Sequence, residues 1–208
     1  MEHDKRDGIL ASAQKAFHKF GFKKASIDQI ARAAGVAKGT IYLAAQSKED
    51  LFYQVLHREI RAWAADTSKI LDPRIPADEL LGMASDAGLA YLESRPLVRA
   101  LLFGECHLLM PQWIDRLDDL TSIGRENIVE ILELGQKQGI FRGELDKEEV
   151  ARLLLDLQIA FFVLHDHGRG KESSRDRPAR LARRRKAALD MVLHGLRLPA
   201  ANTTKASG

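Results

Sequence analysis

The feature that most restricts the fold of this chain is a pair of short helical patterns joined at a glycine near the N-terminus. Ser26 and Gln29 have the spacing of a capping box, so a helix is expected to begin near Ser26. Gly35 ends that helix, and another short helix is expected at residues 38–43. Two short helices joined in this way form a helix-turn-helix pattern. The sequence therefore predicts a helix-turn-helix within the first fifty residues.

Helical periodicity continues on both sides of this pattern. Apolar residues recur every three or four positions from Arg6 until Gly21, which predicts a first helix, and Ser47 is placed to cap a long fourth helix that ends near Ile70. Further helices are expected at about residues 77–94, 97–109, 112–138, 146–166 and 178–196, with a polar loop at 168–177. No stretch shows a convincing strand alternation. The expected fold class is all-α.

Composition and charge exclude several classes of protein. Of the 208 residues 45% are apolar, enough for a buried core, and Cys106 is the single cysteine, so no intramolecular disulfide can form. No stretch reaches the roughly 18 apolar residues of a membrane helix, and the N-terminus is charged, so we expect a cytoplasmic protein. Residues 1–50 carry nine Lys and Arg against six Asp and Glu, whereas residues 51–208 carry 23 of each kind. The excess positive charge lies where phosphate binding would need it.

The N-terminal motifs follow one another in a specific order. They are Ile9-Leu10 through Ala16-Phe17, Gly21-Phe22, Ser26-Ile27, Ile30-Ala31, Ala34-Gly35-Val36, Lys38-Gly39-Thr40-Ile41-Tyr42 and Ser47-Lys48-Glu49-Asp50-Leu51. Over residues 6–52 this series resembles the DNA-binding region of the TetR family. The resemblance implies a helix-turn-helix domain at residues 1–50, a larger helical ligand-binding and dimerisation domain at 51–198, and a tail at 199–208 that we expect to be disordered. It also implies a dimeric repressor that binds a palindromic DNA operator and is released by a small molecule.

Six residues are candidates for DNA contacts: Ser26, Lys38, Gly39, Thr40, Tyr42 and Lys48. A helix enters the major groove when small residues let it approach and polar residues at its N-terminal end reach bases or phosphates. Lys38, Gly39 and Thr40 fit that description. The resemblance implies that Thr40 and Tyr42 contact DNA, Tyr42 through its hydroxyl, and that Lys48 holds the DNA backbone. A phosphate contact is also expected for the serine at the start of the second helix.

The chain departs from the TetR pattern directly after the motif tyrosine. The family usually has an aromatic pair where this chain has Ala44 and Ala45. A phosphate contact and some core packing are lost there, and one lost contact to a charged partner costs about 1.5 to 3 kcal/mol. Three of the residues predicted to contact DNA could instead have a role that involves no DNA contact. Tyr42 can pack the third helix on the first, Lys48 can be a solvated lysine, and Gly39 can mark a turn.

Eight aromatic, soft or polar residues on the fourth to seventh helices are candidates for the lining of a ligand cavity. They are Trp63, Met83, Tyr91, Phe103, Cys106, His107, Met110 and Trp113. For each of them taken separately, ordinary core packing is the commoner role. Glu105 and His107 are polar residues on an otherwise apolar helix, so each must find a partner or face solvent.

The last two predicted helices carry apolar stripes that could form a dimer interface. The stripes are Val150, Leu153, Leu154, Leu157 and Phe161 on one helix, and Leu181, Ala188, Leu189, Val192 and Leu196 on the other. In a dimer they would meet their symmetry mates as a four-helix bundle. An intramolecular core demands the same stripes, so the prediction of a homodimer rests mainly on the family resemblance.

The sequence predicts no catalytic residue, metal site or cofactor. It has no nucleophile with a recognisable base and no phosphate-cradling glycine loop. In the run His165-Asp166-His167, neighbours one and two apart on a helix point in different directions. Two alternatives to the repressor stay open. One is a helical small-molecule-binding protein or enzyme whose N-terminal motif is only structural, and the other is a regulator controlled by a protein partner or by oxidation of Cys106.

Overall fold

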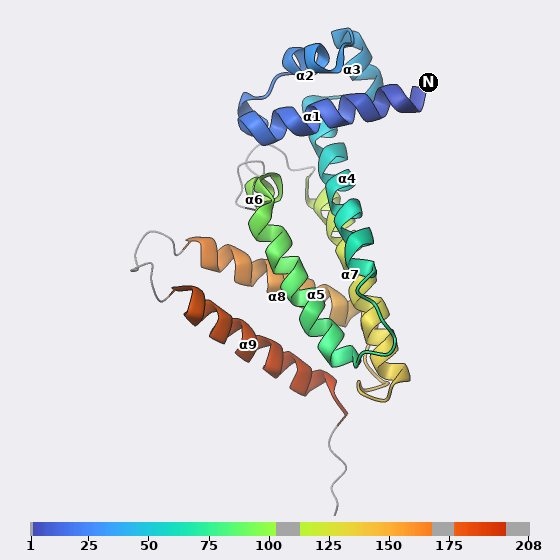
Figure 1. Ribbon diagram of the computed structural model, residues 1–208, viewed down its shortest axis with the longest axis vertical. Helices are drawn as coiled ribbons and strands as arrows, with labels where there is room; N and C mark the ends of the chain where they lie inside the picture. The colour runs from blue at the N-terminus through green and yellow to red at the C-terminus, as the bar shows by residue number, and fades with distance from the viewer. Residues whose placement is uncertain (1, 103–112, 168–176, 199–208) are drawn as a thin grey trace, which may run out of the picture. The chain divides into compact units, whose positions relative to one another are not determined.

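The described part of the chain is helical throughout. A computed structural model describes residues 2–102, 113–167 and 177–198, and within these the pairing of Phe141 with Arg197 is an isolated bridge rather than a strand (Figure 1). The helices are α1 (Glu2–Lys24), α2 (Ile27–Ala34), α3 (Lys38–Ala44), α4 (Lys48–Ser68), α5 (Ala77–Ser94), α6 (Pro96–Leu102), α7 (Trp113–Lys137), α8 (Lys147–His167) and α9 (Arg177–Leu196). The all-α fold class is confirmed. None of the described helices is long and apolar enough to cross a membrane.

The second and fourth helices begin where their capping residues predict. Ser26 Oγ accepts a hydrogen bond from the Gln29 N–H at 3.2 Å, and Gln29 Oε1 accepts one from the Ser26 N–H at 3.1 Å. Gly35 ends α2 in the left-handed conformation, with φ 68°. Ser47 Oγ accepts from the Asp50 N–H at 3.0 Å and so caps α4. These hydrogen bonds fix the turn between α2 and α3 and the start of α4.

The other helices lie close to the residue ranges predicted from the sequence, except where a predicted range extends beyond the described residues. Gly21 has φ 74° and ψ 166° inside α1, so the regular helix stops there and a short turn follows. The predicted helix at 97–109 corresponds to α6, and residues 103–112 lie outside the described residues. Most of the expected loop at 168–177 and the whole tail at 199–208 lie outside them as well.

The chain divides into two compact units. Unit 1 comprises Met1–Ser68 and Ala87–Gly124, and unit 2 comprises Lys69–Asp86 and Arg125–Gly208. The α4 helix therefore belongs with the N-terminal helices, and α5 contributes to both units. The domain boundary at residue 50 follows the motif rather than the packing, and it stays a prediction.

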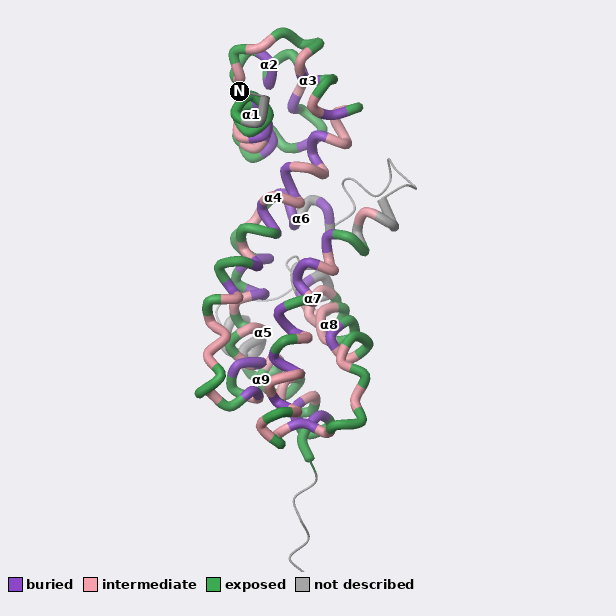
Figure 2. Tube along the Cα trace, turned by 90° about the vertical axis from the view of Figure 1, so that its right-hand side faces the viewer, coloured by how far each residue is buried: buried purple, intermediate pink, exposed green. Residues whose placement is uncertain are grey.

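The core of unit 1 is built around aromatic rings from α1 and α4. Phe52 packs edge-on against Phe17 at 5.1 Å between ring centroids, and against Phe22 at 5.0 Å. Ile30 of α2 and Ile41 of α3 are fully buried in the same unit. Buried and exposed positions alternate along each helix (Figure 2), as an amphipathic helix requires. The N-terminal helices and α4 therefore share one apolar core.

Unit 2 has its own core between α5, α7, α8 and α9. Phe141 is buried there, with Leu80, Ile131 and Leu193 in the same cluster. Gly135 of α7 lies against the Phe141 ring so closely that a Cβ atom would overlap it. The phenylalanine therefore fixes the turn after α7 onto the side of that helix.

Candidate functional site

The structure places four of the predicted DNA contacts on α3. Lys38 and Gly39 are exposed, Thr40 is half-buried, and Tyr42 has 48% of its surface exposed. Ile41 is the residue of α3 that packs into the core, with no exposed surface. Tyr42 is therefore not a core residue, and its contact with DNA stays a prediction.

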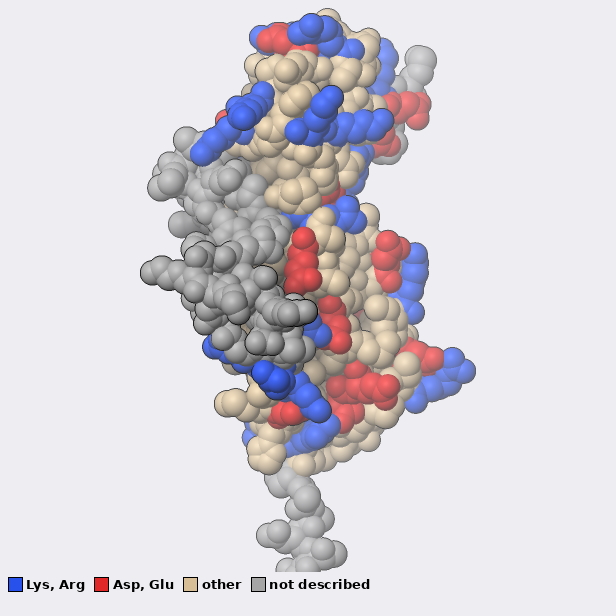
Figure 3. All heavy atoms as spheres, turned by 60° about the vertical axis from the view of Figure 1, so that its left-hand side comes forward, with Lys and Arg blue, Asp and Glu red and all other residues tan. Residues whose placement is uncertain are grey.

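Lys38 begins α3 and forms a surface ion pair. Its ammonium donates a hydrogen bond to Asp28 of α2 at 3.0 Å, and this bond raises the pKa of Lys38 above its usual value. Both side chains are more than half exposed. Such pairs contribute little to stability, so the lysine can exchange its carboxylate partner for a phosphate. Lys and Arg side chains are spread over the N-terminal helices on the face drawn in Figure 3.

Ser26 combines a capping role with a remaining donor. Its oxygen accepts the Gln29 N–H bond, and the residue is half-buried. A serine hydroxyl has one donor in addition to its acceptor lone pairs. The cap is therefore compatible with donation to a phosphate, which stays a prediction.

Lys48 is half-buried, and its ammonium is bonded to the protein backbone. Its ammonium donates to the backbone carbonyls of Phe22 at 2.9 Å, Ala25 at 3.1 Å and Lys23 at 3.4 Å. It also lies 4.5 Å from the centroid of the Phe22 ring. A positive charge at the C-terminal end of a helix interacts favourably with the helix dipole. The predicted phosphate contact of Lys48 stays untested, and this geometry favours a structural role at the end of α1.

The sequence reasoning missed Gln54, which ties α3 to α4. Its Nε2 donates to the Ala44 carbonyl at 3.1 Å and to Asp50 at 3.2 Å, and its Oε1 accepts from Arg6 at 3.1 Å. The small side chains after the motif tyrosine are accommodated here, because Ala45 is buried and the Ala44 carbonyl is bonded. The signal available in the sequence was a glutamine between two apolar pairs, Leu51-Phe52 and Val55-Leu56.

A buried carboxylate joins α1 to α4. Glu59 of α4 is 6% exposed, and its Oε1 lies 2.6 Å from both Gln14 Nε2 and His18 Nε2 of α1. Its second oxygen, Oε2, is buried without a hydrogen-bond partner. Buried charged oxygens are usually paired, so this atom is able to accept a further donor. Sequence reasoning missed this residue, although a glutamate between the apolar neighbours Leu56 and Ile60 was the signal.

Two of the predicted cavity-lining residues, Trp63 and Tyr91, are brought together near the Glu59 carboxylate. Their rings stack at 4.7 Å, and the Arg95 guanidinium lies 5.4 Å from the Tyr91 ring. The Tyr91 hydroxyl and Arg95 Nε are both buried without a hydrogen-bond partner. Burial, and then the charge of Glu59, raise the pKa of Tyr91 above its usual value, so the hydroxyl is a neutral donor. Unit 1 thus contains an aromatic and polar cluster with unused hydrogen-bonding capacity.

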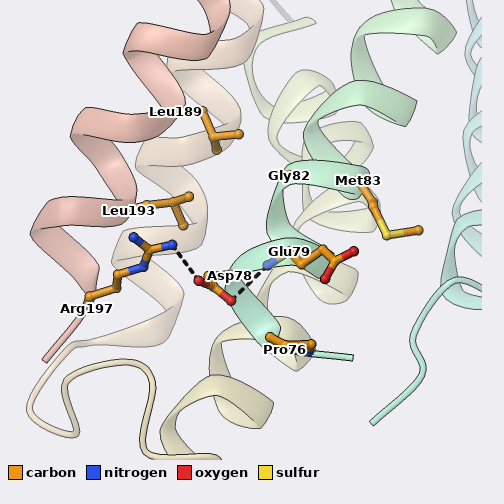
Figure 4. A pocket seen from close by; sticks show the side chains of 8 residues that line it. All are labelled: Pro76, Asp78, Glu79, Gly82, Met83, Leu189, Leu193 and Arg197. Atoms are coloured by element: carbon orange, nitrogen blue, oxygen red, sulfur yellow. Dashed lines mark hydrogen bonds and ion pairs between the residues drawn. The ribbon is translucent and has the colours of Figure 1, made fainter. Parts of the chain in front are cut away.

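Met83 belongs to unit 2, whereas Trp63 and Tyr91 belong to unit 1. It is 40% exposed and lines an open groove of about 530 Å³ in unit 2, between α5 and α9 (Figure 4). Leu189 and Leu193 of α9 face the groove, and Arg197 forms an ion pair with Asp78 at 2.5 Å across its end. For these three of the eight predicted cavity residues, a common role in one ligand site stays a prediction.

The remaining candidates for the cavity cannot be placed. Phe103, Cys106, His107 and Met110 lie outside the described residues. Trp113 begins α7, but its side chain lies outside them as well. Their contact with a ligand stays a prediction.

The predicted stripes of α8 and α9 divide between the core and the surface. On α9 the leucines at 189 and 196 and Val192 pack against the core of unit 2, so this part of the stripe faces inward. Leu153 is 57% exposed, Leu157 is 49% exposed and Met191 is 77% exposed. The exposed apolar side chains are therefore the part available to a second subunit.

Comparison with known proteins defines the class. The sequence model of the bacterial regulatory proteins of the tetR family matches residues 9–55. The transcriptional repressor KstR2 of Mycolicibacterium smegmatis is 30% identical over 156 residues, which cover 73% of this chain and 75% of that protein. The HTH-type regulator YhgD of Bacillus subtilis is 31% identical over 97 residues, and the chain spans about half (51%) of its length.

Solved structures share the fold over nearly the whole chain. FadR from Bacillus subtilis, in complex with stearoyl-CoA, is 17% identical with a TM-score of 0.67 and matches 91% of this chain and 98% of its own. A transcriptional regulator from Saccharomonospora viridis, in complex with choline, is 23% identical with a TM-score of 0.66 and matches 95% and 100%. The protein is a transcriptional regulator with a helix-turn-helix DNA-binding domain. It belongs to the TetR family.

The position of the Lys48 ammonium gives a first prediction. Lys48→Met keeps the side-chain length and removes three donors, so we expect the free energy of unfolding to fall by about 1.5 to 3 kcal/mol, as for hydrogen bonds to a charged group. Thermal unfolding followed by circular dichroism measures the change. Lys38→Met is the matched control, and its midpoint should equal that of the wild type because Lys38 is in a surface pair. A Lys48→Met protein as stable as the wild type, but with weaker DNA binding, would show that a phosphate is its main partner.

Proposed function

We propose that the protein is a dimeric, ligand-responsive repressor that binds a palindromic operator through α3 and is released by a small molecule. The observation that carries this proposal is the exposed side of α3. It presents Lys38, Gly39, Thr40 and Tyr42 outward, while Ile41 anchors the helix in the core. We call α3 the recognition helix. A repressor of this kind acts where the chromosome is, which agrees with the cytoplasmic location expected from the sequence.

Binding to DNA is testable with the region upstream of the protein's own gene. We expect a fluorescent duplex of that region to bind more tightly than a random duplex, with affinity that falls as salt rises. Lys38→Met should weaken binding and make the slope of log affinity against log salt shallower by about 0.9, the value for one phosphate contact. Tyr42→Phe, which removes only the hydroxyl, should weaken binding as well.

The control for these variants is Lys137→Met, which removes an exposed lysine from the end of α7. It should bind as the wild type does. If Lys38→Met and Tyr42→Phe also bind as tightly as the wild type, with unchanged salt slopes, α3 does not contact the DNA as proposed.

Dimerisation is proposed through the exposed parts of α8 and α9. Leu153 and Leu157 are four residues apart, so they lie on the same side of α8. Met191 adds an exposed apolar side chain on α9. Exposed apolar side chains that form a contiguous patch commonly mark a protein interface. A palindromic operator also requires two recognition helices related by a twofold axis.

Light scattering after gel filtration tests the interface. The wild type should have the mass of two chains, and the double variant Leu153→Glu/Leu157→Glu should have the mass of one, because like charges would face each other across the twofold axis. Leu43→Glu is the matched control, since it makes the same change at an exposed leucine of α3 and should leave the dimer intact. A double variant that remains a dimer would place the interface elsewhere.

The effector is proposed to bind at the polar cluster of unit 1. Glu59 Oε2 and the Tyr91 hydroxyl are buried and unpaired there, next to the stacked ring of Trp63. A ligand that carries a hydrogen-bond donor would satisfy the carboxylate oxygen, and aromatic faces also attract a cation. The structural neighbours in complex with stearoyl-CoA and with choline show that this fold can accommodate very different ligands. The polar cluster favours a small molecule with a donor or a positive charge.

Choline and stearoyl-CoA serve as probes of opposite character. We expect choline to raise the midpoint of thermal unfolding and to weaken operator binding, and stearoyl-CoA to do neither. Tyr91→Phe removes only the unpaired hydroxyl, so the choline response should shrink while DNA binding without ligand is retained. A larger response to stearoyl-CoA, or a choline response unchanged in Tyr91→Phe, would contradict the proposed site.

The alternative functions have less support. The relatives of this chain are named as transcriptional regulators and repressors, so we propose that it is not an enzyme. Among the described residues, no group of three or more His, Cys, Asp and Glu side chains could hold a metal ion. Control by oxidation of Cys106 concerns a residue outside the described part of the chain.

A further inference from the structure

Leu43 is the most exposed large apolar side chain of the described residues. It is 89% exposed, compared with 77% for Met191 and 57% for Leu153. It lies on α3, between the exposed Tyr42 and the half-buried Ala44. The packing of unit 1 therefore does not account for a leucine at this position.

Helix geometry shows where Leu43 points. Successive residues of an α-helix are about 100° apart around the axis, because a turn contains about 3.6 residues. Measured from the buried Ile41, Gly39 and Leu43 lie at about 160° and 200°, so they occupy the side of α3 directly opposite the core. Gly39 has no side chain, and a Cβ atom there would meet nothing within 4 Å. On the outermost side of α3, Gly39 therefore leaves free space, and Leu43 follows about one turn later.

The chemistry of this side is apolar, although α3 is proposed to enter a polar groove. In the major groove the bases present hydrogen-bond donors and acceptors, and the apolar group that they present is the C5-methyl of thymine. Leucine has no donor or acceptor, so it cannot read the polar groups of the bases. A leucine that points away from the protein on a groove-binding helix is suited to contact that methyl group.

We infer that Leu43 determines base specificity by contacting the C5-methyl group of one thymine in each half of the operator. The inference rests on the proposed binding of α3 in the major groove. Gly39 lets the helix approach closely, and Leu43 covers the methyl group one turn further along. Thr40 and Tyr42, on either side of this line, supply the polar contacts.

The test removes the methyl group from the DNA and the leucine from the protein. Operator fragments are first selected from genomic DNA with the wild-type protein, and each dT of the operator is then replaced singly by dU, which lacks only the methyl group. One position in each half-site should lose about fourfold in affinity, the factor expected for one buried methyl group. Leu43→Ala should bind the dT operator more weakly, and its affinity should be equal for dT and dU at that position. Its circular dichroism spectrum and melting midpoint should match the wild type, because the side chain is exposed.

Two results would overturn the inference. In the first, dU at every position binds the wild type as well as dT. In the second, Leu43→Ala keeps the same dU penalty, which would assign the methyl contact to another residue. Failure of the proposed function looks different, because the wild-type protein would then select no operator at all.

Discussion

The packing of Phe52 against Phe17 and Phe22 is the interaction on which the DNA-binding unit depends. These rings are almost fully buried, and burial of each contributes roughly 1.5 to 3 kcal/mol. They bring the start of α4 against the end of α1, which is where Lys48 reaches the last carbonyls of α1. The exposed side of α3 follows from this packing, because Gln54 of the same helix α4 holds the last turn of α3.

The α4 helix also carries the residues through which an effector could act. Glu59 is bonded to Gln14 and His18 of α1, and Trp63 stacks on Tyr91 of α5. A ligand that pairs with Glu59 Oε2 would therefore contact the helix that sets the position of α3. Under the proposed function, release from DNA requires that the ligand bind the released conformation more tightly than the DNA-bound one. The hydrogen bonds of Glu59 run from α4 to α1, so a ligand bound there would act on the contact between these two helices.

The sequence predicted the helices well because their ends are set by neighbouring residues. The capping pair Ser26 and Gln29 and the left-handed Gly35 act locally, so their pattern is visible without the fold. Lys48 was harder, because its partners are carbonyls more than twenty positions earlier in the chain. An apolar stripe shows which side of a helix is buried and not what covers it. For that reason the stripe on α9 is compatible with both a partner subunit and an intramolecular core, and only the fold shows that Leu189 and Val192 pack within unit 2.

The predicted cavity-lining residues show the same difference between what the sequence reveals and what only the fold reveals. Trp63 and Tyr91 were predicted from their aromatic character, and they stack on each other, while their contact with a ligand stays a prediction. Met83 was predicted from its soft thioether side chain, and it lines a groove of unit 2. Glu59 was missed because a glutamate within a helix usually faces solvent, and only the fold shows that it is buried.

We propose that two copies of α3 read a symmetric DNA site. Selection of genomic fragments by the purified protein, followed by sequencing, tests this proposal most directly. We expect a single enriched motif made of two inverted half-sites whose centres lie about one helical turn, roughly 10 base pairs, or a multiple of that apart. Enrichment of unrelated fragments, or of a motif without inverted symmetry, would contradict it.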